Sequence, residues 1–305
     1  MKVTVTGATG SLGRALVSEL NEHGHEVIAL TRNAASGIEK LGSSAKVLEW
    51  PSPKVAPPPS EALESQDAVI HLLGEPIAQR WSDEVKKELR DSRVLSTRQL
   101  VAGLRAAGSR PRVLVSQSAS GYYGNRGDEE LDESSAAGSD FLAELVTEWE
   151  AEACRAEDLG VRVVRTRTGV VLSEEGGALD KMLPFFRAGV GGPVAGGRQY
   201  VPWVHSDDVT GAMTAVMGSE AASGPVNVSA PEPATNKELS KTLGRVLKRP
   251  ALAPVPGFAV LTLYGEMAQI VITGQRMLPR RLRDLGYTFR RPELEAALRS
   301  ATGKG

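Results

Sequence analysis

Apolar positions along the first half of the chain alternate between short runs that are typical of β-strands and spacings that are typical of amphipathic helices. The strand-like runs cover residues 3–6, 25–30, 46–50, 67–73, 112–116 and 161–167. Helical spacing lies between them, at residues 14–20, from Ser82 towards Gly108, and at residues 141–150. This alternation predicts an α/β fold with a Rossmann-like, doubly wound parallel sheet.

The second half of the chain is less regular and richer in glycine and proline. A helical pattern covers residues 179–188, and the following segment 189–197 contains too much glycine for regular structure. We expect that segment to form a lid or a pocket wall, or else an ordered loop packed on the first domain. A short strand at residues 224–228, a helix from Asn236 and an apolar helix at residues 258–272 complete the pattern.

These elements predict two structural parts. The first is a domain at residues 1–171, joined by a returning segment at roughly 202–228. The second, which we call the C-terminal lobe, comprises residues 172–201 and 229–305 and is expected to be a smaller α/β unit. The exposed apolar face of the helix at 258–272 could make a homodimer contact.

Composition and charge exclude several classes of function. The 305-residue chain has 36 Lys and Arg against 37 Asp and Glu, a formal net charge of −1. This balance argues against a general surface for nucleic acid or anionic membranes. The basic segment 276–283 is interrupted by apolar residues, so a domain-capping module is expected there. With no apolar stretch of about 18 residues and no signal region, we predict a soluble, cytoplasmic protein.

Cysteine and histidine usage gives little reason to expect metal chemistry. A single cysteine, Cys154, excludes an internal disulfide, and the four histidines are scattered along the chain. We therefore expect no metal site. His71 ends an apolar strand, where a hydrogen-bonded core histidine is more common than a catalyst.

The first strand ends in three glycines, Gly7, Gly10 and Gly13, and a helical pattern follows at once. Glycine is required where the turn needs unusual backbone angles and where the main chain approaches a pyrophosphate closely. The N-terminus of the next helix offers unpaired N–H groups to phosphate. The stretch therefore predicts dinucleotide binding, against the alternative of a simple glycine turn.

The end of the second strand indicates which dinucleotide is bound. An acidic residue at this position accepts hydrogen bonds from the adenosine ribose, whereas an arginine can hold a 2′-phosphate. Here the residues are Thr31, Arg32 and Asn33, with no carboxylate before Glu39. We therefore predict NADP(H) in preference to NAD(H), although Arg32 could also be an ordinary surface arginine.

The order of motifs resembles the extended short-chain dehydrogenase/reductase superfamily, which contains the nucleotide-sugar epimerases. The resemblance rests on the glycine motif at 6–13, Arg93-Val94-Leu95-Ser96-Thr97, Tyr123-Gly124 and Val204-His205-Ser206-Asp207-Asp208-Val209. More narrowly, the chain is similar nearly end to end to an atypical branch described as NAD-dependent epimerases. The pieces that carry this likeness include Gly74-Glu75-Pro76-Ile77, Lys181-Met182-Leu183-Pro184-Phe185-Phe186, and the terminal module from Leu278 to Phe289.

The resemblance, together with the motifs, implies a set of cofactor-binding residues. These are Gly7, Thr9, Gly10, Ser11, Leu12, Gly13, Thr31, Arg32, Leu72, Leu73, Gly74, Glu88 and Arg93. Arg93 stands where extended relatives have an asparagine. It could bind cofactor phosphate or a carboxylate substrate, or it could form an ion pair with Glu88.

The acid/base pair of the superfamily is missing. Its Tyr-x-x-x-Lys motif aligns with Phe141 and Leu145, which can neither transfer a proton nor supply a positive charge. The hydroxyl position falls on Ala119, and only a one-residue shift restores Ser118.

Two interpretations remain open for the chemistry. Tyr122 or Tyr123 could act as the phenol with Arg93 as the nearby cation, or the fold could sense the cofactor without hydride chemistry. We take Ser118 and Tyr122 as candidate catalytic residues. The candidate substrate residues are Tyr123, Arg198, Tyr200 and Trp203.

The sequence thus favours an NADP(H)-dependent oxidoreductase or epimerase. Its partner would be a small polar or nucleotide-linked substrate, held between the first domain and the C-terminal lobe. The alternative is a non-catalytic, NADP(H)-binding regulatory protein.

Overall fold

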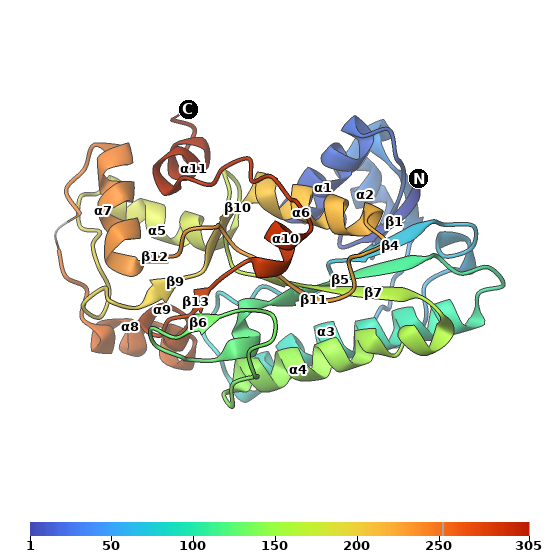
Figure 1. The fold of residues 1–305 in the computed structure, drawn as a ribbon, viewed down its shortest axis with the longest axis horizontal. Coiled ribbons are helices and arrows are strands. Elements are labelled where there is room, and N and C mark those ends of the chain that lie inside the picture. Colours follow the sequence, from blue (N-terminus) through green and yellow to red (C-terminus); the bar gives the residue numbers. More distant parts are fainter. Residues whose placement is uncertain (252, 305) are drawn as a thin grey trace.

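A single seven-stranded parallel sheet organises the first domain of the computed structural model, which describes residues 1–251 and 253–304 (Figure 1). The strand order is β11-β7-β5-β4-β1-β2-β3. The chain therefore builds the sheet outwards from β1 in one direction, to β2 and β3, and then from β4 in the opposite direction, as in a doubly wound fold. The Rossmann-like prediction is therefore confirmed. The strands are β1 (Lys2–Thr6), β2 (Glu26–Thr31), β3 (Lys46–Glu49), β4 (Ala68–His71), β5 (Val113–Ala119), β7 (Arg162–Thr168) and β11 (Gly224–Val228).

Helices cover both faces of this sheet (Figure 1). Val3 and Val5 of β1 belong to the core on one face, and Val69 of β4 and Leu114 of β5 belong to the core on the other. This division follows from the alternation of side chains along each strand. The first face is covered by α1 (Ser11–Glu22), α2 (Ala34–Leu41) and α6 (Ser206–Gly218), and the second by α3 (Asp83–Ala106) and α4 (Phe141–Cys154).

The remaining elements are short and lie mainly in the C-terminal lobe, around a separate apolar core. They include three two-stranded pairs, β8 with β10, β9 with β12 and β6 with β13. The strands are β6 (Glu130–Leu131), β8 (Val170–Leu172), β9 (Tyr200–Val201), β10 (Trp203–His205), β12 (Ala234–Thr235) and β13 (Arg276–Met277). The helices are α5 (Gly177–Arg187), α7 (Asn236–Leu247), α8 (Gly257–Tyr264), α9 (Gln269–Ile272), α10 (Arg280–Asp284) and α11 (Leu294–Ser300).

Two elements differ from the prediction. The apolar helix expected at 258–272 is broken into α8 and α9, because Gly265 has a φ of +62°, which ends α8. Strand β5 extends three residues beyond Ser116, to Ala119. The hydroxyls of Ser116 and Ser118 therefore lie within the sheet, where both side chains are buried.

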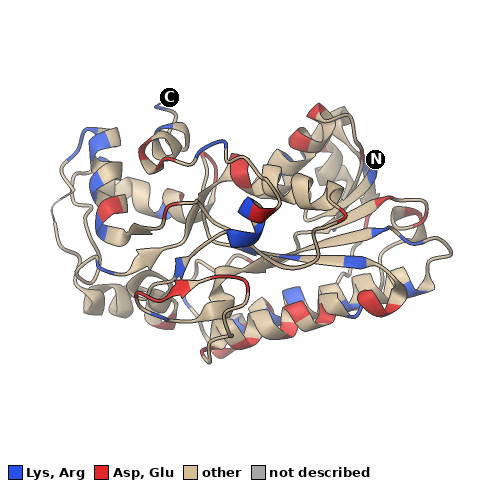
Figure 2. Cartoon of the chain, viewed as in Figure 1, with Lys and Arg blue, Asp and Glu red and all other residues tan. Residues whose placement is uncertain are grey.

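Acidic and basic residues lie close together in several parts of the fold. In Figure 2 acidic and basic residues are interspersed along α3 and α4. In the basic segment, Arg276 and Arg280 form ion pairs with Glu130, on the short strand beside β13. Within residues 1–251 and 253–304, no helix is long and apolar enough to cross a membrane, and no group of three acidic, histidine or cysteine side chains could hold a metal ion.

Candidate functional site

The glycine turn joins β1 to α1 in a geometry that only glycine permits. Gly7 has a φ of +70°, and the N–H of Gly10 donates to the Gly7 carbonyl oxygen at 3.1 Å. A Cβ on Gly13 would lie 2.2 Å from that same carbonyl oxygen. The turn is thus held tightly against the first residues of α1.

The N-terminus of α1 presents free polar groups at this turn. In the part of the chain that the structure describes, no side chain caps the helix, whose N-cap is Gly10. The predicted residues Gly10 and Ser11 are exposed, and Thr9 and Leu12 are half-buried. Uncapped N–H groups and the helix dipole favour an anion such as a pyrophosphate.

A glycine loop after β8 lies beside the same turn. Arg14 of α1 donates to Glu175 at 2.6 Å, and a Cβ on Gly176 would lie 3.3 Å from the Ser11 hydroxyl. In the sequence, only the pair Gly176-Gly177 indicates a loop here, and it does not indicate this contact. The loop brings the C-terminal lobe to the edge of the glycine turn.

A cavity of about 300 Å³ lies at the carboxyl ends of β2, β3 and β4. Its lining contains four of the predicted cofactor residues, Arg32, Leu73, Gly74 and Glu88. The Arg32 side chain is 72% exposed, and its nearest carboxylate is that of Glu75, at 3.8 Å. Two other predicted residues lie outside the lining: Thr31 hydrogen-bonds to Asn33, and the Leu72 N–H donates to Thr6.

Lys54 also lines this cavity and was missed from the sequence. Its ammonium group donates to both carboxylate oxygens of Glu88, at 2.9 and 2.7 Å. The proline-rich segment that contains Lys54 has no periodicity from which its direction could be predicted. Glu88 therefore pairs with Lys54, and the ion pair with Arg93 that the sequence allowed does not form.

Arg93 instead fixes the loop between β4 and α3. Its guanidinium donates to the carbonyl oxygens of Glu75 and Leu89, at 2.9 and 3.0 Å. A Cβ on Gly74 would lie 2.9 Å from the guanidinium carbon, so glycine is needed where the arginine crosses the chain. Burial lowers the pKa of Arg93 to about 10, while Glu75 opposes this shift. The arginine remains a cation, but its hydrogen bonds are used within the protein.

The position of the expected tyrosine is occupied by an apolar cluster. Phe141 begins α4, and its ring packs edge-on against Trp81 with 5.3 Å between centroids. Leu145 is 1% exposed and shares a cluster with Leu89 and Trp149. Neither side chain offers a proton or a charge, so the absence of the acid/base pair in the sequence is matched by hydrophobic packing in space.

Ser118 belongs to a buried polar network and does not face an open site. Its hydroxyl donates to Glu150 of α4 at 2.6 Å. Arg167 of β7 donates to both Glu150 oxygens, at 2.8 and 2.9 Å, and Arg165 donates to one at 3.1 Å. The prediction that Ser118 is a catalytic hydroxyl gains no support, because the β5 extension turns the serine towards α4.

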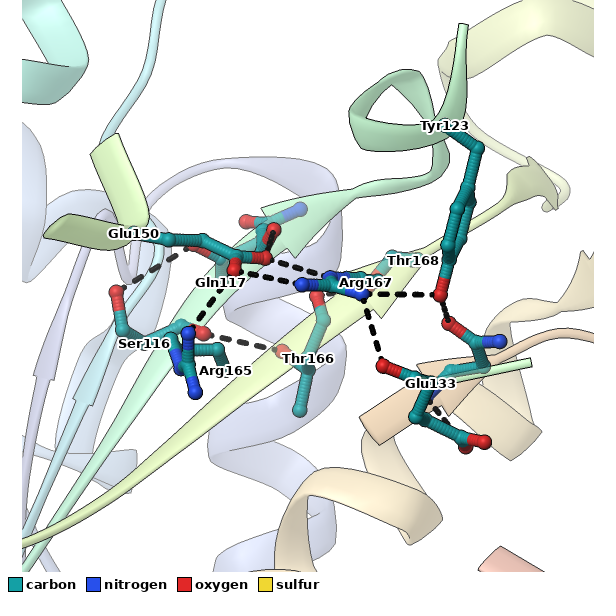
Figure 3. Close-up of polar contacts among 11 residues, drawn as sticks. Ser116, Gln117, Tyr123, Glu133, Glu150, Arg165, Thr166, Arg167 and Thr168 are labelled. Atoms are coloured by element: carbon teal, nitrogen blue, oxygen red, sulfur yellow. Dashed lines mark hydrogen bonds and ion pairs between the residues drawn. The ribbon is translucent and has the colours of Figure 1, made fainter. Parts of the chain in front are cut away.

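The two adjacent tyrosines have different environments. Tyr123 is fully buried; its hydroxyl donates to Asn227 at 2.6 Å and accepts from Arg167 at 3.1 Å (Figure 3). Burial raises the pKa of Tyr123 to about 12, and Arg167 opposes the shift. A substrate-contacting role for Tyr123 does not fit this burial. Tyr122 is half-buried, and the Arg167 guanidinium carbon lies 3.4 Å from the centre of its ring.

The other predicted substrate residues are dispersed. Trp203 is 1% exposed and belongs to the apolar core of the C-terminal lobe. Arg198 is exposed, and Tyr200 is half-buried beneath the guanidinium of Arg276, at 5.3 Å. A second cavity of about 360 Å³, lined by Asn125, Arg126, Gly138 and Asp140 among others, lies next to the start of α4. It was not predicted.

Most of the chain matches known protein families and relatives. The profile of the NAD dependent epimerase/dehydratase family matches residues 3–229, and a domain of unknown function, DUF1731, matches residues 255–301. An Arabidopsis thaliana protein, "Epimerase family protein SDR39U1 homolog, chloroplastic", is 39% identical over 98% of this chain and 86% of its own length.

Two solved structures are similar along almost the whole chain. The crystal structure of human epimerase family protein SDR39U1 (isoform 2) with NADPH has a TM-score of 0.89 and 36% identity, and covers 99% of both chains. A nucleoside-diphosphate sugar epimerase from Corynebacterium glutamicum has a TM-score of 0.76 and 33% identity, with 99% of this chain and 58% of that one covered.

Proposed function

This chain belongs to the NAD dependent epimerase/dehydratase family, and we propose that it binds NADP(H) along the carboxyl edge of its parallel sheet. The observation that carries the proposal is the cavity beside Arg32, whose guanidinium is largely exposed and lies 3.8 Å from the Glu75 carboxylate. An arginine in this position can form charge-assisted hydrogen bonds with a 2′-phosphate. The human relative crystallised with NADPH supports this choice of cofactor.

The glycine turn would hold the pyrophosphate of the cofactor. The uncapped N-terminus of α1 provides N–H groups, and the close contact between Gly13 and Gly7 leaves the main chain bare on that side. Leu73 and Gly74 would line the adenosine end together with Arg32. When bound, NADPH supplies a hydride at its nicotinamide ring.

We further propose an oxidoreductase or epimerase activity on a small polar or nucleotide-linked substrate, with Tyr122 as the proton-transferring group. Ser118 and Tyr123 are buried in the Glu150 network, and Phe141 has no proton to give. Tyr122 remains half-exposed, with the Arg167 cation stacked on its ring. That cation would stabilise the negative charge that the phenol oxygen acquires when its proton passes to a substrate oxygen.

A second candidate is a non-catalytic regulator that binds NADP(H). It is favoured by the apolar cluster at Phe141, Leu145 and Trp81, which fills the place of the superfamily's acid/base pair. In this case Tyr122 would only pack on Arg167, and its hydroxyl would be dispensable.

The test is a turnover assay with purified protein, NADPH, and a panel of carbonyl compounds and nucleotide sugars. We expect activity that Tyr122→Phe removes while NADPH affinity is retained. Arg32→Gln should weaken NADPH by about ten- to a hundredfold and leave NADH unchanged, since a phosphate contact of this kind contributes about 1.5–3 kcal/mol. Tight NADPH binding without any turnover would favour the regulator, and equal loss of both nucleotides in Arg32→Gln would refute the phosphate assignment.

A further inference from the structure

We propose that Lys54 is a second ligand for the 2′-phosphate and that Glu88 competes with the phosphate for it. This inference rests on the proposed NADP(H) binding and concerns how the same cavity distinguishes the phosphorylated from the unphosphorylated cofactor. Its basis is the presence of two cations, each with its own carboxylate, around one cavity.

The fold brings Lys54 and Arg32 to the same edge. Strands β2 and β3 are parallel neighbours, and Thr31 at the end of β2 pairs in register with Glu49 at the end of β3. The chain segments that follow these two strands therefore leave the sheet side by side. Arg32 comes from the first segment and Lys54 from the second, and both line the cavity.

The backbone around Lys54 is fixed, whereas its side chain can move. Trp50 is 3% exposed and its indole N–H donates to the Ala56 carbonyl at 2.8 Å, which closes the segment on itself. The N–H groups of Val55 and Ala56 both donate to the Ser52 carbonyl. The Lys54 side chain is 40% exposed on a flexible four-carbon stem, so its ammonium group can turn without moving the main chain.

The charges of the cavity balance only while no phosphate is present. Arg32 faces Glu75, and Lys54 faces Glu88 at 2.7 Å. A phosphate monoester brings nearly two negative charges at neutral pH. Beside Glu88 this charge would be repelled unless Lys54 turned from the carboxylate to the phosphate oxygens.

The exchange of partners is favourable for NADP(H) only. The Lys54–Glu88 pair is partly exposed, and such pairs contribute little to stability, whereas a lysine bonded to a phosphate makes a stronger, charge-assisted contact. NAD(H) has a hydroxyl at this position and gives Lys54 no reason to leave Glu88. The Glu88 carboxylate therefore competes with the phosphate for the Lys54 ammonium group and lowers the affinity for NADP(H).

The experiment measures the affinities of NADPH and NADH by fluorescence titration for wild type, Lys54→Met and Glu88→Gln. Lys54→Met should weaken NADPH about tenfold and leave NADH within about twofold, as expected for the loss of a hydrogen bond to a charged group. Glu88→Gln should strengthen NADPH about threefold without changing NADH, and added salt should reduce this gain. Adenosine 2′,5′-bisphosphate carries the same 2′-phosphate and can be titrated as a competitor of the bound nucleotide. Its affinity should likewise fall in Lys54→Met and rise in Glu88→Gln.

Lys46→Met and Glu61→Gln serve as matched controls. Lys46 forms an exposed ion pair with Glu61 near the start of β3, and neither residue lines the cavity. Both variants should bind NADPH and NADH as wild type does. If they shifted NADPH as the cavity variants do, the effect would belong to net charge and the proposal would be wrong.

The failures of the two proposals are distinguishable. If wild type binds neither nucleotide, the proposed function fails and this inference fails with it. If NADPH binds but Lys54→Met and Glu88→Gln leave the ratio of NADPH to NADH affinity unchanged, only the role of Lys54 is overturned. Thermal melts verify that each variant is folded, and because Glu88→Gln predicts a gain of affinity, loss of folding cannot imitate its result.

Discussion

The turn at Gly7–Gly13 and the network around Glu150 both lie near the carboxyl ends of β-strands, but their polar groups are used differently. The N-terminus of α1 has no side-chain cap within residues 1–251 and 253–304, and the nearby Arg32 is largely exposed. Glu150 is 5% exposed and accepts from Ser118, Arg165 and Arg167. The first region keeps its hydrogen-bonding capacity for a ligand, whereas the second uses it to join α4 to the sheet.

This difference explains how the fold can persist without the Tyr-x-x-x-Lys pair of the superfamily. The cofactor side depends on backbone geometry, which glycine positions preserve by themselves. The opposite side is held by internal contacts, so apolar replacements at Phe141 and Leu145 keep α4 in place. Four experiments test this contrast between the two regions.

Glu150→Gln should reduce the free energy of unfolding by about 3–5 kcal/mol, because breaking a buried ion pair leaves the other charge uncompensated. The stranded charge would be that of Arg167, whose side chain is only 3% exposed. Urea denaturation followed by circular dichroism measures the change. Glu148→Gln on the same helix is the control, since Glu148 is 46% exposed and its contact with Arg90 is 3.5 Å long. Equal, small losses in both variants would show that the Glu150 network does not hold the domain together.

Gly13→Ala should weaken NADPH by about a hundredfold, the loss expected when one or two main-chain hydrogen bonds to a charged phosphate, each contributing about 1.5–3 kcal/mol, no longer form. The added Cβ would lie 2.2 Å from the Gly7 carbonyl oxygen, so the turn must move. Gly108→Ala is the control, because among the described residues nothing lies within 4 Å of a Cβ at Gly108. Unchanged NADPH affinity in Gly13→Ala would contradict a phosphate site at this turn.

His71 lies at the end of β4, between β1 and α3, and should make stability depend on pH. It is fully buried between Thr6 of β1 and Thr97 of α3, at 2.8 and 3.0 Å, and burial lowers its pKa from 6.5 to about 3. Below pH 6.5 the unfolded chain protonates this histidine and the folded chain does not. The free energy of unfolding should therefore fall with decreasing pH, by up to about 1.4 kcal/mol per unit.

His71→Gln should remove that contribution. Urea unfolding of wild type and variant at pH 7.5, 6.5, 5.5 and 5 measures the difference between the two slopes. Parallel slopes would mean that His71 takes up its proton in the folded protein as well, which would require water to reach the buried space between β1 and α3.

Glu175→Gln should have the smallest effect, about 0.5 kcal/mol or less on unfolding, as for most exposed ion pairs. Its partner Arg14 is 35% exposed and Glu175 is 77% exposed. Differential scanning fluorimetry at low and high salt measures the change, which should vanish at high salt. A large loss would show that the loop after β8 is a structural part of the glycine turn.

The fold and the cofactor side could be predicted because their signals are local. The spacing of Gly7, Gly10 and Gly13 after a β-run requires no distant information, and Arg32 follows directly from the end of the second strand. Lys54 could not be found in this way, since its segment has no periodic pattern. Its position depends on the pairing of β2 with β3.

The network around Glu150 could not be predicted from the sequence for a different reason. Glu148 and Glu150 look alike in the sequence, but two positions along a helix separate them by about 200° of rotation, so one is exposed and the other buried. Ser118 and Ala119 show the same sensitivity in a strand, where a shift of one residue exchanges the two faces. Sequence patterns predicted the elements well, but the face on which a polar side chain lies was fixed only by packing.

One ion pair joins two residues that are far apart in the sequence and are therefore synthesised at different times. Arg290 donates to both carboxylate oxygens of Glu19 at 2.6 Å, across 271 residues of sequence, and Glu19 lies on α1, directly behind the phosphate turn. At a translation rate of about 5–20 residues per second, Glu19 leaves the ribosome roughly 15–55 seconds before its partner. The ion pair therefore cannot stabilise α1 until residue 290 has been synthesised and released, and before that time the helix lacks this contact.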